Sequence, residues 1–305
     1  MPLIEATERH EPPERPDDIR VLPVRRPGRW IATLLVVLIA LAVVNSVANN
    51  PHFQWSVVGH YLFDGRVLRG VRITIELTIV AMAIGIAGGI VLAIMRLSPN
   101  RLVGGTSWLY IWFFRGTPLL VQIFFWYFAA ELFPTIGIGI PFGPAFFHLH
   151  ANAVLKPFVV SILALGLNEA AYMAEIVRAG IISVDRGQYD AAASLGMTRL
   201  LMMRRVVLPQ AMRVIVPPTG NEAISMLKNT SLVSIIAYTE LFYTVQLIYS
   251  VNYKTIPLLI VASIWYLAMT SVMYVGQYFI ERRFGRGFSG AHQVSLRARW
   301  LSFMR

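Results

Sequence analysis

Long apolar segments recur along the chain and are separated by shorter stretches that hold most of the charged residues. Each of six segments offers about 20 mostly apolar residues, the length that a helix needs to cross a hydrocarbon core about 30 Å thick. Inside lipid a helix pairs its own backbone N–H and C=O groups by hydrogen bonds, so these segments are predicted to be helices. The pattern predicts an all-α integral membrane protein with six transmembrane helices, at residues 31–47, 73–95, 108–130, 158–176, 214–241 with a polar interruption, and 256–280.

Composition agrees with this class of protein. The 305 residues are 56% hydrophobic and have a mean hydropathy of +0.59, which is too apolar for an ordinary soluble globule. The chain has no cysteine, which excludes disulfides, thiolate nucleophiles and cysteine metal sites.

The net charge of +11 is unevenly distributed along the predicted topology. One side of the membrane holds Arg15, Arg20, Arg25, Arg26, Arg29, Arg96, Arg101, Arg186, Arg199, Arg204, Arg205, Arg282, Arg283 and Arg286, and the opposite loops hold Arg66, Arg69, Lys156 and Lys254. The positive-inside rule therefore predicts that both termini are cytoplasmic. Membrane orientation explains the basic residues, and no nucleic-acid partner is expected.

The ends of the chain differ in composition from its middle. Residues 1–29, rich in arginine, acidic residues and proline, are predicted to be a disordered cytoplasmic tail. Residues 30–69 are predicted to hold an extra N-terminal transmembrane helix and an external loop. No convincing cleavage pattern follows the apolar segment, which favours an uncleaved helix over a signal peptide. Residues 285–305 are predicted to be a basic cytoplasmic tail.

A motif lies in the predicted cytoplasmic interval at residues 187–209. Asp190-Ala-Ala-Ala-Ser-Leu-Gly196 is followed by Val206-Val-Leu-Pro209. This pattern resembles the EAA loop of ABC importer permeases, with Asp in place of Glu and Val in place of Ile. Small residues permit close backbone contact, glycine can turn the chain, and proline can end or open a helix. The alternative is an amphipathic surface helix that happens to carry an alanine run.

Four flanking segments extend the resemblance over roughly residues 70–284. The quoted stretches, Phe114-Arg-Gly-Thr-Pro-Leu-Leu-Val-Gln122, the run 167–188, Leu208-Pro-Gln-Ala-Met-Arg213 and Lys228-Asn-Thr-Ser-Leu232, resemble the polar amino-acid uptake branch of ABC permeases, the histidine, glutamine and arginine type. The resemblance implies a type I importer core of five helices at residues 70–284, extended here by one N-terminal helix. It also implies that the docking loop acts through Gly187, Asp190, Ala191, Ala192 and Gly196.

The same resemblance implies the partners. Cytoplasmic ABC ATPase subunits would bind ATP and magnesium, so no cofactor and no catalytic residue is expected in this chain. A second permease copy or a homologous permease would complete the pathway in a bacterial cell membrane, and an extracellular or periplasmic binding protein would deliver a polar amino acid. The mechanism implied is alternating access.

Four consecutive polar residues interrupt the apolar segment 214–241. Lys228, Asn229, Thr230 and Ser231 are tolerable in a membrane only where they face protein, water or substrate. Together with Glu222 they offer both charges that a zwitterionic amino acid requires, and the sequence predicts that these five residues bind substrate. The alternative is that Glu222 and Lys228 neutralise each other.

Further polar residues occur in the other predicted spans. Asn168 and Glu169 are predicted to line the cavity, and Thr117 is added to the substrate-binding set because Pro118 must interrupt its helix and free backbone groups. That break is equally compatible with a hinge. Two ion pairs are also expected: Glu175 with Arg178, three residues on, and Glu76 with a group on a neighbouring helix.

Other classes of function fit the sequence less well. An ATPase-independent ion-coupled transporter or channel would also use buried charges and broken helices, but it would not require the docking loop. No glycine-rich nucleotide loop and no nucleophile-base pair emerges, which argues against a membrane enzyme. His148 and His150 share the spacing of a metal pair in a long external loop, but no third ligand lies nearby and no metal site is expected.

Overall fold

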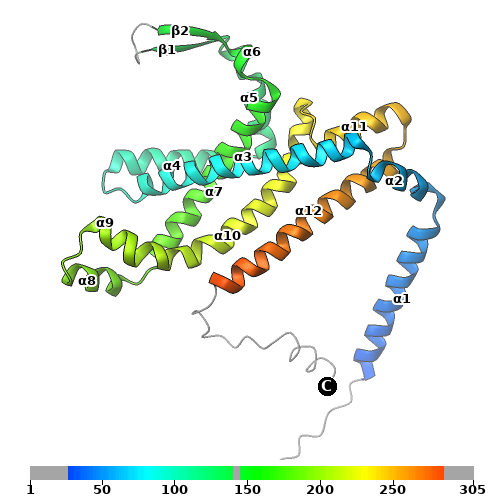
Figure 1. The fold of residues 1–305 in the computed structure, drawn as a ribbon, viewed down its shortest axis with the longest axis horizontal. Helices are drawn as coiled ribbons and strands as arrows, with labels where there is room; N and C mark the ends of the chain where they lie inside the picture. The colour runs from blue at the N-terminus through cyan, green and yellow to red at the C-terminus, as the bar shows by residue number, and fades with distance from the viewer. Residues whose placement is uncertain (1–26, 140–144, 285–305) are drawn as a thin grey trace, which may run out of the picture. The chain divides into compact units, whose positions relative to one another are not determined.

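The computed structural model describes residues 27–139 and 145–284. The chain divides into two compact units, one comprising Met1–Asn50 with Ala291–Arg305 and the other Pro51–Gly290. Figure 1 labels the elements, which are α1 (Pro27–Asn49), a 3-10 turn (Pro51–Phe53), α2 (Trp55–Leu62), α3 (Gly65–Arg96), α4 (Arg101–Gly116), α5 (Leu119–Leu132), β1 (Thr135–Gly139), β2 (Ala145–His150), α6 (Ala151–Val154), α7 (Pro157–Ile182), α8 (Arg186–Ser194), α9 (Arg199–Met202), a π-helical turn (Met203–Val207), α10 (Leu208–Asn229), a 3-10 segment (Thr230–Ile236), α11 (Leu241–Asn252) and α12 (Thr255–Phe284).

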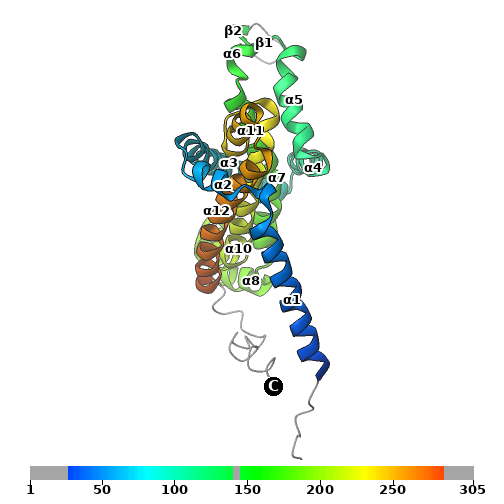
Figure 2. The same ribbon diagram turned by 90° about the vertical axis from the view of Figure 1, so that its right-hand side faces the viewer.

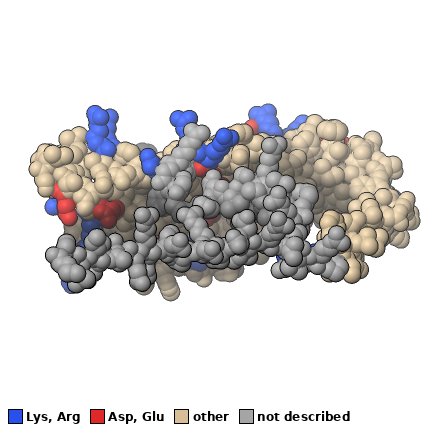
Figure 3. All heavy atoms as spheres, turned by 90° about the horizontal axis from the view of Figure 1, so that it is seen from below, with Lys and Arg blue, Asp and Glu red and all other residues tan. Residues whose placement is uncertain are grey.

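The predicted class, an all-α membrane protein, is confirmed. Four of the described helices, α1, α3, α7 and α12, are long and apolar enough to cross a membrane, and the number rises to six if each of two bent helix pairs is one crossing. The count of six is therefore an upper value for the described residues. Large apolar side chains cover much of the described surface. The described part of the face in Figure 3 is mostly tan, the colour of residues other than Lys, Arg, Asp and Glu. Lipid is the natural solvent for such a surface.

Helix α1 forms the first unit's described part. Its 23 residues span about 34 Å at 1.5 Å each, enough for the hydrocarbon core. Pro27 at its start fits the first turn, where a missing N–H costs nothing. The prediction that the tail extends to residue 29 is corrected accordingly, and residues 1–26 and 285–305 lie outside the described residues. The predicted external loop before residue 70 also contains α2 and the first turn of α3.

Helices α3 and α7 pack tightly in the second unit. A Cβ at Gly85 would collide with Glu169, and one at Gly89 would collide with Met173 and lie 2.9 Å from the backbone nitrogen of Ala174. Small residues thus bring the two helix backbones together, as is common in membrane bundles. Helix α10 packs against α7 and α12, and α11 packs against α3 and α12 (Figures 1 and 2).

Two predicted spans are bent. Helices α4 and α5 meet at 106°, and the segment Arg199–Ile236 meets α11 at 45°. The second bend follows from local chemistry, because Ala237 adopts a left-handed conformation with φ 58° and Glu240 starts α11 as its N-cap. The prediction of one helix over 214–241 is therefore wrong at its C-terminal end.

The predicted long external loop contains a β-hairpin. Strands β1 and β2 pair antiparallel, with Thr135 opposite His150 and Gly137 opposite His148. His148 and His150 share a face of the extended strand, as their spacing suggested. Within the described residues no group of three potential ligands gathers to hold a metal ion.

Candidate functional site

A broken helix is the first component of the site. Pro118 has no N–H to donate, and its ring displaces the carbonyl four residues earlier, which belongs to Phe114. The side-chain nitrogen of Gln122 lies 2.9 Å from that oxygen and 2.8 Å from the Thr117 hydroxyl oxygen. The amide of Asn168, on α7, also donates to the Phe114 carbonyl at 3.0 Å. Two side chains therefore replace the hydrogen bond that the proline removes.

These contacts account for two residues predicted to bind substrate. Asn168 is 8% exposed and also donates to Gln122 Oε1 at 3.1 Å, while the Thr117 hydroxyl donates to the carbonyl of Phe113 at 2.9 Å. Both side chains have protein partners, and the hydrogen bonds of Asn168 tie the break to α7. Their contact with a ligand stays a prediction. The sequence analysis missed Gln122, whose one signal is a lone amide four residues after the proline.

Glu169 is the second component. It is 3% exposed, its methylene groups pack over Gly85 of α3, and its Oε1 atom is fully buried without a hydrogen-bond partner in the described structure. A buried polar atom without a partner is costly, and such atoms in native proteins call for an explanation. A ligand that donates a hydrogen bond or carries positive charge would provide one.

Three further side chains are linked to this carboxyl group in sequence, from Glu222 to Arg115 and from Arg115 to Tyr172. Glu222 of α10 lies within electrostatic range of both Glu169 and Arg115. The guanidinium of Arg115, at the end of α4, stands 5.2 Å from the ring centroid of Tyr172, on α7. The end of α4 and the interiors of α7 and α10 thus assemble two carboxylates, one guanidinium and one aromatic ring. Of the predicted set, the structure brings Glu169 and Glu222 together.

The polar run after Glu222 is arranged differently from the prediction. Lys228 is exposed and forms no ion pair with Glu222, from which it is turned by about 120° around the helix, as a spacing of six residues dictates. The hydroxyl of Thr230 donates to the carbonyl of Leu227 at 2.7 Å, and that of Ser231 to the carbonyl of Lys228 at 2.7 Å. These hydroxyls support the turn into the 3-10 segment. A contact of Lys228, Asn229, Thr230 or Ser231 with substrate stays a prediction.

Other charged side chains on the helices have partners within the chain. Glu175 and Arg178 form the expected ion pair at 2.7 Å. The expectation for Glu76 is wrong, because it pairs with Arg72 one turn earlier on its own helix, at 2.6 Å. Glu240, which the sequence analysis did not single out, is completely buried and accepts hydrogen bonds from the Phe242 and Tyr243 N–H groups and from the hydroxyl of Tyr266, at 2.8, 2.7 and 2.8 Å respectively.

A helical loop at the other end of α7 is the third component. Asp185 caps α8 by accepting from Gly187 N at 2.8 Å, Gly196 turns the chain with φ +71°, and Thr198 caps α9. Glycine is suited to that left-handed position. Asp190, Ala191 and Gly196 are exposed, whereas Ala192 is buried.

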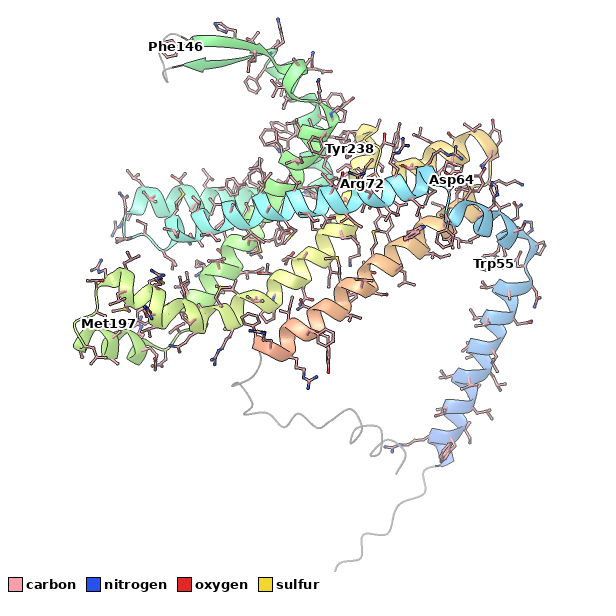
Figure 4. The ribbon with its side chains drawn as sticks, in the orientation of Figure 1. Trp55, Asp64, Arg72, Phe146, Met197 and Tyr238 are labelled. Carbon is pink, nitrogen blue, oxygen red and sulfur yellow. The ribbon has the colours of Figure 1, made fainter. Side chains whose placement is uncertain are left out.

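The loop is attached to the helices that carry the two carboxylates. The Tyr189 hydroxyl donates to the carbonyl of Ile181 at 3.2 Å, and Gln210 of α10 donates to Gln188 at 3.2 Å. Met173 and Val177 of α7 share an apolar cluster with Val184 in the loop and with Val207, Ala211 and Ile215 around the start of α10. Met197 marks the loop's tip in Figure 4. These contacts connect the loop directly to α7 and α10.

A membrane bundle with a broken helix, a charged central cluster and an exposed helical loop defines the permease subunit of an ABC importer. The chain belongs to the family described as binding-protein-dependent transport system inner membrane component, whose family model matches residues 85–286. Its relatives transport amino acids, and this chain is an amino-acid permease subunit of that kind. Permease subunits are not themselves enzymes.

Several known proteins are similar to the chain. It is 44% identical over 276 residues, 90% of this chain and 85% of the relative, to the arginine transport system permease protein ArgU of Corynebacterium glutamicum. It is 37% identical to the L-cystine transport system permease protein TcyB of Bacillus subtilis, over 71% of this chain and 86% of the relative. A crystal structure of an amino acid ABC transporter with histidines matches 72% of this chain and 94% of its own, with a TM-score of 0.61 and 37% identity.

Proposed function

We propose that this permease translocates an amino acid with a cationic side chain. The observation that carries the proposal is the buried, unpartnered Oε1 atom of Glu169 beside Glu222. Two carboxylates and one guanidinium leave an excess of negative charge at the site, which a guanidinium or ammonium side chain would neutralise. The similarity to an arginine permease supports the same class of substrate.

We infer the assembly from membership in the family. Two permease chains, identical or homologous, would enclose the pathway in a bacterial cell membrane with their termini in the cytoplasm, and a binding protein would deliver the amino acid from outside. ATPase subunits that bind ATP and magnesium would dock on α8 and α9. Their closure would move the loop, and α7 and α10 would carry that movement to Glu169 and Glu222. Alternating access would result.

The test compares two substrates in one variant. Glu169→Gln keeps the size of the side chain but removes the charge, and a hydrogen bond to a charged group contributes roughly 1.5–3 kcal/mol, equivalent to at least about tenfold in rate or affinity. Arginine uptake by the reconstituted complex should fall by about that factor, with uptake of glutamine little changed. Glu169→Asp is the control that keeps the charge. An equal loss for both amino acids would overturn the cationic assignment without overturning the permease.

A further inference from the structure

Three arginines occupy the first two turns of α3, Arg66, Arg69 and Arg72. Cations are unfavourable near a helix N-terminus, which carries partial positive charge. Two of the three have an acidic partner in the chain: Arg66 lies 3.0 Å from Asp64 and Arg72 lies 2.6 Å from Glu76. The hydrogen bond from Arg66 holds the pKa of Asp64 below its usual value, so this carboxylate is already occupied.

The middle arginine has no such partner. Across residues 27–139 and 145–284 the structure gives the exposed side chain of Arg69 no ion pair and no hydrogen bond. In Figure 4, the labels of Asp64 and Arg72 mark the two ends of this part of α3. A cation left without an anion at the N-terminal end of a helix indicates that the anion comes from outside the chain.

A pocket lies beside this arginine, between α3 and α11. Arg66 and Arg69 line its exposed part, and Gly70, Ile73, Leu247 and Ile248 contribute its apolar part. The close approach of the two helices depends on Gly70, where a Cβ would lie 2.9 Å from Cα of Leu241. The pocket thus joins a cationic edge to an apolar wall, which is the complement of an amphiphile with a negatively charged head.

The location fits the boundary between headgroups and hydrocarbon. Helix α2, directly before α3, carries Trp55 and Tyr61, residue types that favour the membrane interface. Further along α3, Ile75 and Ile79 are 40% and 63% exposed and apolar, as expected for lipid contact. The orientation proposed above places this end of α3 outside the cell, where basic residues are usually scarce, so three arginines there require a reason.

We propose that this pocket binds one anionic phospholipid, with its phosphate on the guanidinium of Arg69 and the start of an acyl chain against Ile73 and Leu247. A guanidinium fits two phosphate oxygens at once, and the lipid would neutralise the cation that the chain leaves unpaired. Inorganic phosphate shares the headgroup chemistry but makes no use of the apolar wall. The bound lipid would brace α3 against α11, beside the bend before α11.

Native mass spectrometry of the purified permease-ATPase complex tests the proposal. Phosphatidylglycerol and phosphatidylcholine with identical acyl chains are titrated in turn, and the lipids retained per permease chain are counted. Wild type should retain phosphatidylglycerol in preference. Arg69→Gln should lower that preference about fivefold, because a basic residue near an anionic membrane contributes ~1 kcal/mol. Arg69→Lys should retain most of it. The matched control is the double variant Arg72→Gln, Glu76→Gln, which removes a closed ion pair at no change in net charge and should behave as wild type.

Three outcomes would overturn the proposal. Equal retention of phosphatidylglycerol by wild type and Arg69→Gln would show that this arginine holds no lipid. Displacement of the lipid by an excess of inorganic phosphate would show that the site takes a free anion. Weaker binding of the amino-acid-binding protein by Arg69→Gln, with lipid retention unchanged, would assign the arginine to an acidic protein surface.

Discussion

Gln122 is the residue that makes the sharp turn between α4 and α5 tolerable inside a membrane. In water a solvent molecule would satisfy the carbonyl that Pro118 releases, but hydrocarbon offers no donor. The nitrogen of Gln122 lies within 3.1 Å of three oxygens, those of the Phe114 and Thr117 carbonyls and of the Thr117 hydroxyl. This amide therefore contacts all three of these oxygens at the break, and its own oxygen accepts from Asn168, which shares the Phe114 carbonyl with it.

Removing this amide should destabilise the fold. Gln122→Leu keeps a similar volume but removes the donor to the Thr117 carbonyl and the Oε1 acceptor of Asn168, at a cost of about 1–3 kcal/mol for each unsatisfied group. The midpoint of thermal unfolding of the detergent-solubilised permease should fall. Phe125→Leu, at a 52% exposed position one turn further on, serves as the control and should change little. Identical midpoints for the two variants would contradict the assigned role.

At the residue scale the sequence identified residues that are unfavourable in an apolar helix whatever their partners are. Pro118 predicted the break, and Glu169 stood out as a carboxylate in an apolar span. Gln122 and Glu240 were missed because their value depends on partners 46 residues away on α7 and 26 residues away on α12. The expected closeness of Glu222 and Lys228 ignored the angle between them, since six residues do not complete a whole number of turns.

At the scale of elements, α3 and α7 form the tightest described contact of the bundle, and it is built on glycines. Lipid tails are as apolar as the helix surfaces, so the hydrophobic effect does not drive helices together inside a membrane. Van der Waals contact between the two backbones stabilises the pair instead, and it requires small side chains at the contact. Gly85 and Gly89 meet that condition on one face of α3. The contact also fixes the position of Glu169 along α3, beside Gly85.

One added methyl group should test this packing. Gly89→Ala places a Cβ against Met173 and 2.9 Å from a backbone nitrogen, so α7 must shift, and overpacking of this kind costs about 1–3 kcal/mol. Gly105→Ala in α4 is the matched control, because no atom lies within 4 Å of its new Cβ and alanine favours helix by up to ~1 kcal/mol. Unfolding midpoints in detergent should therefore move in opposite directions. Parallel shifts would refute the packing argument.

Elements with long uniform patterns were predicted well and bent ones were not. The apolar runs of α3, α7 and α12 exceed the length of a membrane crossing, so length and hydropathy alone indicate a helix at each of them. The 106° angle after Gly116 has no counterpart in hydropathy, because the apolar pattern continues on both sides of the break. The hairpin was taken for a loop because glycines and prolines dominate its middle.

At the scale of the whole molecule, one exposed patch stands apart from the lipid-facing surface. Leu195 and Leu200, in the helical loop proposed as the ATPase docking site, are 81% and 79% exposed. The positive-inside rule places this loop in water, where large apolar side chains mark a contact with another protein. Asp190 lies five residues before Leu195 and is also exposed, so an ATPase partner that covers this loop would meet both an apolar and an acidic group.

Charging the patch should release the ATPase. Leu195→Glu buries a carboxylate in the expected interface, and a truncated or mismatched central contact typically costs at least about 2 kcal/mol of binding. The fraction of ATPase that co-purifies with the tagged permease should drop by more than about tenfold. Leu195→Ile, which keeps the apolar volume, should retain the partner. Undiminished co-purification of the Leu195→Glu protein would place the docking surface elsewhere.

Helix α7 is continuous from Pro157 to Ile182, and its one proline stands at the first position, where it fits the helix. Glu169 lies 13 residues before its end, a distance of about 20 Å along the axis. Such a rod acts as a lever: a tilt of about 10° over that length displaces the carboxyl group by about 3.5 Å, more than a hydrogen bond spans. A ligand within hydrogen-bond distance of this carboxyl group in one position of the helix would be beyond that distance in the other. A small tilt at the loop would therefore be enough to release the ligand.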